Sequence, residues 1–241
     1  MNPPCYDLHT HVVPGVDDGP VTPGEALRII EKMRNAMPKG SVVAATSHFS
    51  TNMAYLAAMS RADRSCRFAE KASDESLCVI PAGELLLGIR KSGVHELISY
   101  PGTHTVLVEF THGLFWFSVL RRIVRLLKCG YRPLLAHAER YKWATANRLR
   151  LLAGMGAGVS MSMRSLAIPR YVENAEWIIS SGMCHMVTSD CHNIRDMVLG
   201  DYARETVERL CPGGWRTLAE ENPRILLEDG QLPPLGGAGR G

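Results

Sequence analysis

The chain alternates short apolar runs with longer segments in which apolar residues recur at helical spacing. The short runs are typical of buried strands, and the longer segments are typical of amphipathic helices. The runs predicted to be strands are Tyr6–Leu8, Val42–Thr46, Leu77–Ala82, Thr105–Phe110, Pro133–Ala136, Gly158–Met161 and His185–Thr188. Strands that alternate with helices in this way predict an α/β fold built around a parallel sheet.

The first predicted helix has a clear start. Thr22 and Glu25 have the spacing of a capping box, and Pro23 stands at the first helical position. Its apolar stripe is expected at Leu27, Ile30, Met33 and Met37. Further helices are predicted at Tyr55–Ala72, Trp116–Cys129, Tyr171–Ser180 and Tyr202–Leu210. Gly130 and Gly182 fall where glycines that end helices are expected.

Length and composition favour a single domain over residues 1–229, followed by a flexible Gly/Pro-rich tail at 230–241. A chain of 241 residues has the length of one α/β barrel, and no segment is apolar enough for membrane insertion. A net charge of +3 argues against a nucleic-acid-binding protein, which would be strongly basic. Seven cysteines without a Cys-x-x-Cys pair fit free thiols in the cytoplasm.

Residue types that bind metal ions follow six of the seven predicted strands. They are His9, His11, Asp18, His48, Glu84, Glu109, His137, Asp190 and His192. The C-terminal ends of parallel strands meet at one face of a barrel, so these side chains are expected to converge. Imidazole and carboxylate ligands together suit Mn²⁺, Fe or Zn²⁺. Nine ligands are too many for one ion and fit a cluster of two or three ions that share carboxylates.

A structural role is the competing interpretation, because a single histidine at a strand end is more often structural than metal-bound. Glu109 is harder to explain in that way, since the apolar run Val106–Phe110 would bury an unpaired carboxylate at a cost of several kcal/mol. The presence of His, Asp or Glu at the ends of six strands favours the metal site over a structural role. Cys191 is expected to point away from the ions. The remaining histidines are interpreted as surface or helix residues, and they are His95, His104, His112 and His185.

Several motifs carry a resemblance to a known family. The specific strings are Pro-Gly-Val-Asp-Asp-Gly-Pro at residues 14–20 and His-Ala-Glu-Arg-Tyr at 137–141, accompanied by Asp-Leu-His-Thr-His at 7–11 and Ser-Asp-Cys-His-Asn at 189–193. Together they resemble the PHP (polymerase and histidinol phosphatase) superfamily, and more closely the bacterial metal-dependent protein tyrosine phosphatases of capsule and exopolysaccharide synthesis. The resemblance implies a distorted (β/α)₇ TIM-like barrel with a trinuclear centre, usually of Mn²⁺, with Fe, Zn²⁺, Co²⁺ or Mg²⁺ as alternatives.

The resemblance also implies how the ligands are shared. The first ion would be bound by His9, His11, Glu84 and Asp190. The second would be bound by Glu84, Glu109 and His137. The third would be bound by Asp18, His48 and His192. Asp18 rather than Asp17 matches the family's ligand, because it stands directly before Gly19.

The implied reaction is the hydrolysis of a phosphotyrosine protein, with a bacterial tyrosine kinase as the expected partner. A metal-bridging hydroxide is the expected nucleophile, and Arg140 is expected to hold a phosphoryl oxygen. Asp190 or His192 is expected to protonate the leaving phenolate. No cysteine is followed by arginine at the Cys-x₅-Arg spacing, which excludes the cysteine-based class of tyrosine phosphatase.

Two stretches depart from the family, and one of them is residues 160–166 after the sixth predicted strand, which resemble the family only loosely. The other departure follows the Ser-Asp-x-His-Asn motif. An Arg-Pro-Pro segment usually follows Ser-Asp-x-His-Asn, whereas this chain continues as Ile194-Arg195-Asp196-Met197, so a phosphate-binding arginine is either shifted to Arg195 or lost. The alternative functions are another PHP phosphoesterase (a histidinol-phosphate phosphatase or a nuclease) and a metal-binding inactive regulator. The small net charge counts against the nuclease, and the complete ligand set counts against the regulator.

Overall fold

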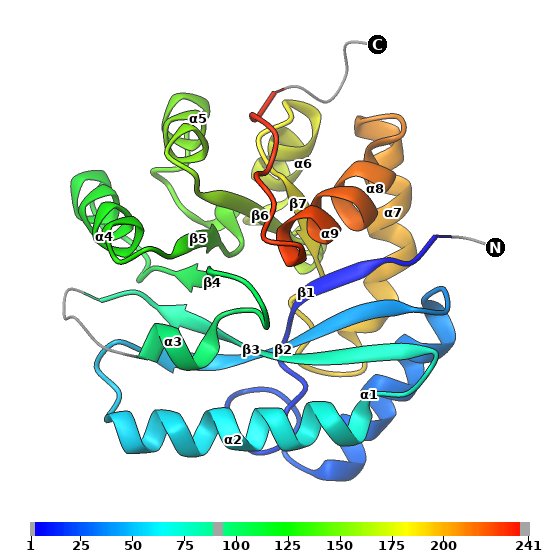
Figure 1. Ribbon diagram of the computed structural model, residues 1–241. Helices are drawn as coiled ribbons and strands as arrows, with labels where there is room; N and C mark the ends of the chain where they lie inside the picture. Colours follow the sequence, from blue (N-terminus) through cyan, green and yellow to red (C-terminus); the bar gives the residue numbers. More distant parts are fainter. Residues whose placement is uncertain (1–2, 89–93, 237–241) are drawn as a thin grey trace.

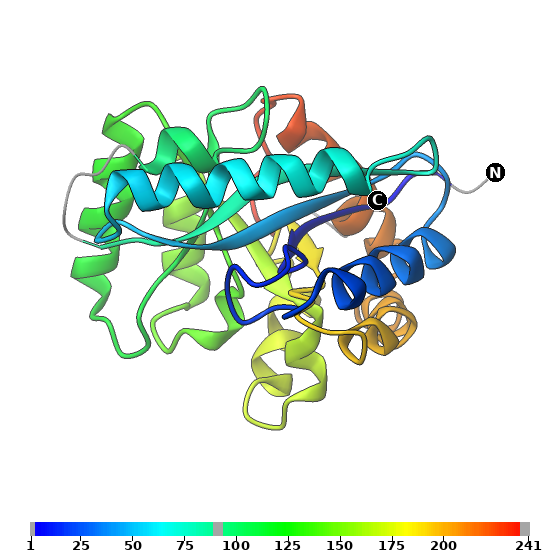
Figure 2. The same cartoon turned by 90° about the horizontal axis from the view of Figure 1, so that it is seen from below.

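A computed structural model describes residues 3–88 and 94–236 of the chain (Figure 1). These residues form one parallel sheet with the strand order β1-β2-β3-β4-β5-β6-β7. The strands are β1 Tyr6–Thr10, β2 Ser41–Ser50, β3 Leu77–Leu86, β4 Thr105–Glu109, β5 Arg132–Leu135, β6 Gly158–Ser162 and β7 Met186–Thr188. Helices cover the outside of the sheet, and Figure 2 shows α2 running along β2 and β3. The predicted single-domain (β/α)₇ barrel and its seven strands are confirmed.

The barrel is nearly closed where the segment after β7 returns to β1. Thr10 and Cys191 form a parallel bridge, and the Asp190 N–H donates a hydrogen bond to the His9 carbonyl at 2.9 Å. The His11 N–H donates in turn to the Cys191 carbonyl at 2.7 Å. Two segments about three quarters of the chain length apart are therefore fixed side by side at the C-terminal end of the barrel.

Strands β2 and β3 are longer than predicted, because each continues to pair beyond the expected end. They remain in register for ten residues, so that His48 lies opposite Glu84. Gly83 makes this extension possible, since a Cβ at this position would lie only 2.6 Å from Phe49 and 2.7 Å from Ile98. His48 and Glu84 are consequently strand residues rather than loop residues.

The predicted helices are all present, with shifts of up to three residues at their ends. They are α1 Pro23–Ala36, α2 Tyr55–Ala72, α4 Trp116–Lys128, α6 Val172–Ser180 and α7 Leu199–Leu210. Shorter helices that were not predicted are α3 Val94–Ile98, α5 Ala146–Gly154, α8 Gly214–Arg216 and α9 Asn222–Leu227. Gly130 and Gly182 have positive φ angles, as expected for glycines that end helices. No helix of the described residues is long and apolar enough to cross a membrane.

Helix α1 starts as predicted, and Ile30, Met33 and Met37 of its predicted stripe pack against the core, but Leu27 does not. The Thr22 hydroxyl accepts from the Glu25 N–H, and the Glu25 carboxylate accepts from the Thr22 N–H, which completes the capping box. Its buried residues are Ala26, Ile29, Ile30 and Met33. Leu27 is 53% exposed, so its place in the predicted stripe was wrong. The small Ala26 occupies the inward position one residue earlier.

The C-terminal segment 230–236 has no helix or strand, but it packs beneath the N-terminal ends of β6 and β7. The Gly236 N–H donates to the Gly182 carbonyl at 2.8 Å, and Leu232 lies against the barrel core. Residues 230–236 therefore lie against the barrel, and residues 237–241 lie outside the described residues. The packing also corrects the interpretation of His185, which is 2% exposed instead of lying on the surface.

His185 is expected to make folding sensitive to acid. Its Nδ1 accepts from the Val159 N–H at 3.0 Å, so Nε2 carries the proton and donates to the Pro233 carbonyl at 2.9 Å. Burial lowers the pKa of His185 from 6.5 to about 4. The unfolded chain therefore binds the proton more tightly, and stability is lost as the pH falls from about 6.5 towards 4. This shift corresponds to about 3 kcal/mol.

Urea denaturation at several pH values checks this prediction. The free energy of unfolding falls between pH 7 and pH 4, and this decrease should be about 3 kcal/mol smaller for His185→Gln than for the wild type. Glutamine keeps one donor and one acceptor but does not titrate in this range. Equal acid sensitivity of the two proteins would contradict the assignment.

Candidate metal centre

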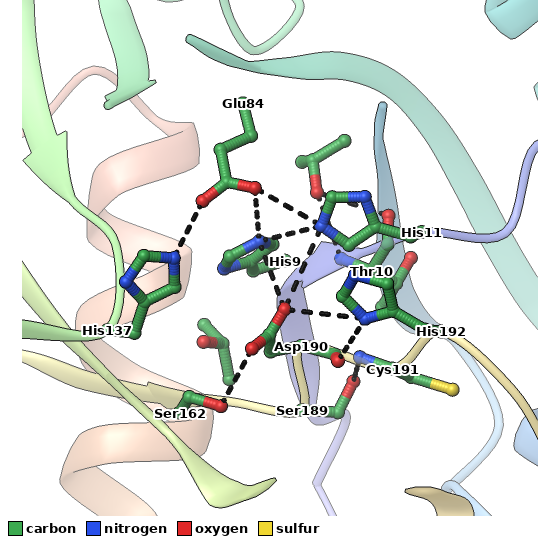
Figure 3. Close-up of polar contacts among 12 residues, drawn as sticks. His9, Thr10, His11, Glu84, His137, Ser162, Ser189, Asp190, Cys191 and His192 are labelled. Atoms are coloured by element: carbon green, nitrogen blue, oxygen red, sulfur yellow. Dashed lines mark hydrogen bonds and ion pairs between the residues drawn. The ribbon is translucent and has the colours of Figure 1, made fainter. Parts of the chain in front are cut away.

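All nine predicted ligand residues lie at the C-terminal end of the barrel. Figure 3 shows part of this cluster, with these side chains pointing toward one another: His9, His11, Glu84, His137, Asp190 and His192. The nine ligand residues come from β1 (His9) and the loop after it (His11 and Asp18), from β2 (His48), β3 (Glu84) and β4 (Glu109), and from the segments directly after β5 (His137) and β7 (Asp190 and His192). Their donor atoms form three overlapping groups. These groups are His9, His11 and Asp190; His48, Glu84 and Glu109; and His11, Asp18, His48 and His192.

The first group is built on two imidazoles that point the same way. The Nε2 atoms of His9 and His11 lie 3.1 Å apart. Two nitrogens at this separation can both contact one ion at about 2.1 Å, which is the usual metal–nitrogen distance for zinc. Asp190 Oδ1 lies 3.6 Å from His9 Nε2 and 3.8 Å from His11 Nε2. The pair of histidines and the carboxylate thus offer three ligand atoms to a single ion.

Glu84 connects the groups at the centre of the site. Its Oε2 lies 3.2 Å from ring nitrogens of His9, His11 and His48. Its Oε1 lies 2.9 Å from His137 Nε2. A carboxylate that faces several sets of imidazoles has the arrangement of a bridging ligand.

The third group lies at the mouth of the site. Asp18 Oδ1 is 3.3 Å from the Nε2 atoms of both His48 and His192. Here the geometry departs from the sharing that the resemblance implied. His48 also reaches Glu109, at 3.5 Å from its Nδ1 to Oε1, and Glu109 is grouped with His48 and Glu84 rather than with His137. His48 therefore stands between two of the groups.

The chemistry of the donor set fits bound cations. Glu84 is 1% exposed, and its Oε2 has no hydrogen-bond partner among the described residues. The Nδ1 atoms of His9 and His137 are also buried and have no hydrogen-bond partner among the described residues. Buried polar atoms are almost always paired, because leaving them without a partner costs free energy. A cation at this cluster would supply the partner that Glu84 Oε2 lacks, whereas His9 and His137 face the cluster through Nε2 and not through Nδ1.

The two glutamates of the cluster have pKa values that are shifted in opposite directions. Burial opposes ionisation of Glu84, but His9, His11 and His137 outweigh it and hold the pKa of Glu84 well below its usual value. Burial raises the pKa of Glu109 to about 7, and the charge of Glu84 adds to this shift. Metal binding requires ionised carboxylates and neutral imidazoles, so it is coupled to the release of protons.

The backbone is turned sharply at two of the site residues. His137 has a φ of 34° and Asp190 a φ of 55°, both in the left-handed region that side chains other than glycine rarely adopt. Each follows directly after a strand, where the turn aims the side chain into the barrel mouth. Backbone strain of about 1–3 kcal/mol per residue is typical of functional sites.

Asp17 is a site residue that the sequence analysis passed over in favour of Asp18. Its Oδ2 lies 3.0 Å from His11 Nδ1 and accepts from the His48 N–H at 2.9 Å. Such a carboxylate fixes the orientation of a metal-binding imidazole and the nitrogen that carries its proton. Gly19 lets the loop approach, because a Cβ there would lie 2.3 Å from the His11 carbonyl oxygen. The adjacent Asp17 and Asp18 are the signal that could have identified both roles.

Arg140 lies beside Asp190. Its Nη2 donates to Asp190 Oδ2 and, at 3.1 Å, to Ser162 Oγ, while Nε donates to Ser165 Oγ at 3.2 Å. Arg195 is exposed, and it contacts the motif through a backbone N–H that donates to Asn193 Oδ1. A second arginine, Arg164, contacts Asp190 and His192 instead.

The histidines outside the cluster differ from one another. His104 is exposed and lies 3.2 Å from Asp229, and His112 is exposed beside Tyr141, so both agree with the surface interpretation. The side chain of His95 lies outside the described residues. Cys191 is fully buried, with its thiol directed to the Asn193 carbonyl and away from the cluster.

Comparison with known proteins shows the family to which the chain belongs. The family model described as "Capsular polysaccharide synthesis, CpsB/CapC" matches residues 5–228. The chain belongs to this family. Tyrosine-protein phosphatase CpsB of Streptococcus agalactiae is 24% identical over 209 residues, which cover 78% of this chain and 83% of that protein. CpsB of Streptococcus pneumoniae is 24% identical over 204 residues, with the same coverage.

Two solved structures share the barrel. The first, from a study described as "Crystal structures of YwqE from Bacillus subtilis and CpsB from Streptococcus pneumoniae, unique metal-dependent tyrosine phosphatases", matches with a TM-score of 0.73 and 22% identity over 96% of this chain and 98% of that chain. Histidinol phosphate phosphatase from Lactococcus lactis, complexed with zinc, L-histidinol and phosphate, matches with a TM-score of 0.51 and 12% identity over 87% and 94%. At identities of 22% and 12%, these two matches show that the fold is shared and nothing more.

Proposed function

We propose that this chain is a metal-dependent protein tyrosine phosphatase that acts on a bacterial tyrosine kinase of capsule or exopolysaccharide synthesis. Membership of the CpsB/CapC family supports the proposal, as do the curated relatives named tyrosine-protein phosphatase CpsB. The observation that carries it is the convergence of three His and carboxylate groups around Glu84. Clustered cations at such a site would supply an ionised water as nucleophile and positive charge for the phosphoryl oxygens.

The ligands proposed for these cations are His9, His11, Asp18, His48, Glu84, Glu109, His137, Asp190 and His192. We propose Mn²⁺ as the physiological ion, because imidazole and carboxylate without thiolate suit it, with Fe, Zn²⁺, Co²⁺ and Mg²⁺ as the alternatives. Elemental analysis of protein purified without chelator identifies the ion.

The residues beside the cluster would bind the phosphoryl group and move the proton. Arg140 presents a planar fork of donors, which suits two oxygens of a phosphoryl group. Asp190 contacts Arg140, and His192 Nδ1 lies 3.6 Å from Asp190 Oδ1. One of these two residues is proposed to deliver the proton that the phenolate takes up as it leaves.

A cytoplasmic location is part of the proposal. All seven cysteines are free thiols, and Cys184 and Cys191 are buried. Unpaired cysteines are typical of the reducing cytoplasm. Burial also raises the pKa of Cys184 and Cys191 above the usual value, so neither has the thiolate character that a cysteine nucleophile needs.

Comparing rates on three substrates tests the function. The metal-loaded protein should hydrolyse a phosphotyrosyl peptide faster than histidinol phosphate or a single-stranded oligonucleotide. A chelator should abolish the activity, whereas thiol alkylation should leave it intact. Chelator-resistant turnover that alkylation abolishes would overturn the proposal.

A histidinol-phosphate phosphatase is the second candidate, and it is favoured by the structural neighbour that binds L-histidinol and phosphate. A higher kcat/KM on histidinol phosphate than on the peptide would replace the first proposal with this one. A protein that binds metal but hydrolyses none of the three substrates would be a regulator instead.

A further inference from the structure

Arg164 reaches the site from β6, in the turn Met163–Ala167 that directly follows this strand. Its Nη1 lies 3.3 Å from the Asp190 carbonyl oxygen, 3.9 Å from Asp190 Oδ2 and 2.8 Å from His192 Nδ1. Its Nε lies 3.5 Å from Asp196 Oδ1. The side chain is 28% exposed, so the guanidinium is held at the site but remains open to solvent.

Arg140 and Arg164 flank the same carboxylate. Both approach Asp190 Oδ2, whereas Asp190 Oδ1 faces His9, His11 and His192. If Oδ1 binds a cation, Asp190 cannot balance two guanidinium groups as well. Each guanidinium has a second carboxylate neighbour, Glu139 for Arg140 and Asp196 for Arg164. A cation on Oδ1 would still weaken the attraction of Asp190 for both arginines, and the N–H donors that they direct at Oδ2 would then favour an anion between them.

The contact between Arg164 and His192 also depends on what His192 binds. A histidine that ligates a cation through Nε2 carries its proton on Nδ1. The Asp190 carbonyl oxygen, 2.8 Å away, is positioned to accept that proton. Nδ1 then has no lone pair for Arg164, so the Nη1 hydrogen that faces Nδ1 can be donated to another acceptor while the contact with the Asp190 carbonyl oxygen stays.

The loop that follows His192 has hydrogen bonds of its own besides the contact of Arg164 with Asp196. Asp196 Oδ2 already accepts from the backbone N–H groups of His192 and Asn193, at 2.8 and 3.1 Å, and from the Asn193 side chain at 3.1 Å. The loop is therefore closed by Asp196 itself. A solely structural role leaves unexplained why a second guanidinium lies next to Asp190.

We propose that Arg164 is a second phosphate-binding residue of this site, which with Arg140 binds the oxygens of the phosphoryl group. Arg164 thus takes the place that the sequence suggested for Arg195, whose side chain is exposed. The inference rests on the proposed phosphatase function for its substrate, and on the geometry of Asp190 and His192 for its site.

Equilibrium binding and kinetics of Arg164→Ala test the proposal. Titration calorimetry of the Mn²⁺-loaded protein with inorganic phosphate should show binding weakened by about 10- to 100-fold, the range for a lost hydrogen bond to a charged group. KM for a phosphotyrosyl peptide should rise by a similar factor. Arg164→Lys should recover part of the loss, because it restores the charge but not the planar fork. The manganese content of every variant should equal that of the wild type.

Two further variants separate the explanations. Arg195→Ala should bind phosphate as the wild type does, and so should Arg67→Ala, which removes an exposed ion-pair arginine of α2. If Arg164→Ala binds phosphate as tightly as the wild type, the proposal is wrong. The proposal is also wrong if Arg164→Ala loses its manganese, because Arg164 would then act by positioning the metal ligands. If Arg164→Ala does not fold, Arg164→Gln is judged by the same criteria. A wild type that binds phosphate but does not hydrolyse the peptide would remove the phosphatase function and leave the Arg164 result standing.

Discussion

Replacing Glu84 by glutamine is expected to release the bound metal and to lower kcat/KM on a phosphotyrosyl peptide by roughly a thousandfold. Glu84 is 1% exposed, and its two oxygens face ring nitrogens of four histidines. Glutamine has nearly the same shape but no charge. The variant thus removes the bridging charge while leaving the packing of β3 intact.

Elemental analysis, peptide kinetics and circular dichroism on the same preparation measure this effect. Glu75→Gln is the matched control, because Glu75 is exposed and pairs with Lys39 on the surface. The control should keep its metal and its rate. Full metal content and full activity in Glu84→Gln would show that the centre does not depend on this carboxylate.

Replacing Arg140 by alanine is expected to lower kcat/KM by about a hundredfold or more while the protein still binds metal. The guanidinium is 15% exposed and is held in place by Ser162, Ser165 and Asp190. Such a fixed donor pair stabilises charge on the phosphoryl oxygens without having to reorganise during the reaction. Arg140→Lys should recover only part of the rate, since lysine has no planar fork.

Steady-state kinetics on the phosphotyrosyl peptide check the role of Arg140. Arg209→Ala, which removes an exposed partner of Glu176, serves as the control and should leave both kcat and KM unchanged. If Arg140→Ala keeps the wild-type kcat/KM, Arg140 has no part in binding the phosphoryl group. If Arg140→Ala loses its metal, Arg140 acts by holding the ligand Asp190 in position.

The strands and the location of the site could be predicted because both depend on local sequence patterns. Apolar runs mark the strands, and parallel strands bring their C-terminal ends to one face whatever the helices do. Glu109 illustrates this, since a carboxylate within a buried run needs a partner. The nine residues therefore converge as expected, although they are spread over most of the chain.

Features that depend on register and packing could not be predicted from the sequence. The position of His48 opposite Glu84 follows from ten residues of pairing between β2 and β3, and it places His48 next to Glu109. The burial of His185 depends on the tail folding back beneath the barrel. Arg164 follows a strand that supplies no predicted ligand, so nothing in its local sequence connects it with Asp190.

Phosphate release from a phosphotyrosyl peptide, measured while chelator-stripped protein is titrated with Mn²⁺, tests the central claim most directly. The three overlapping groups of ligands predict no activity without metal and a rate that rises with added Mn²⁺ until two to three ions are bound per chain. A full rate in the stripped protein, or no phosphate release at any Mn²⁺ concentration, would contradict the account.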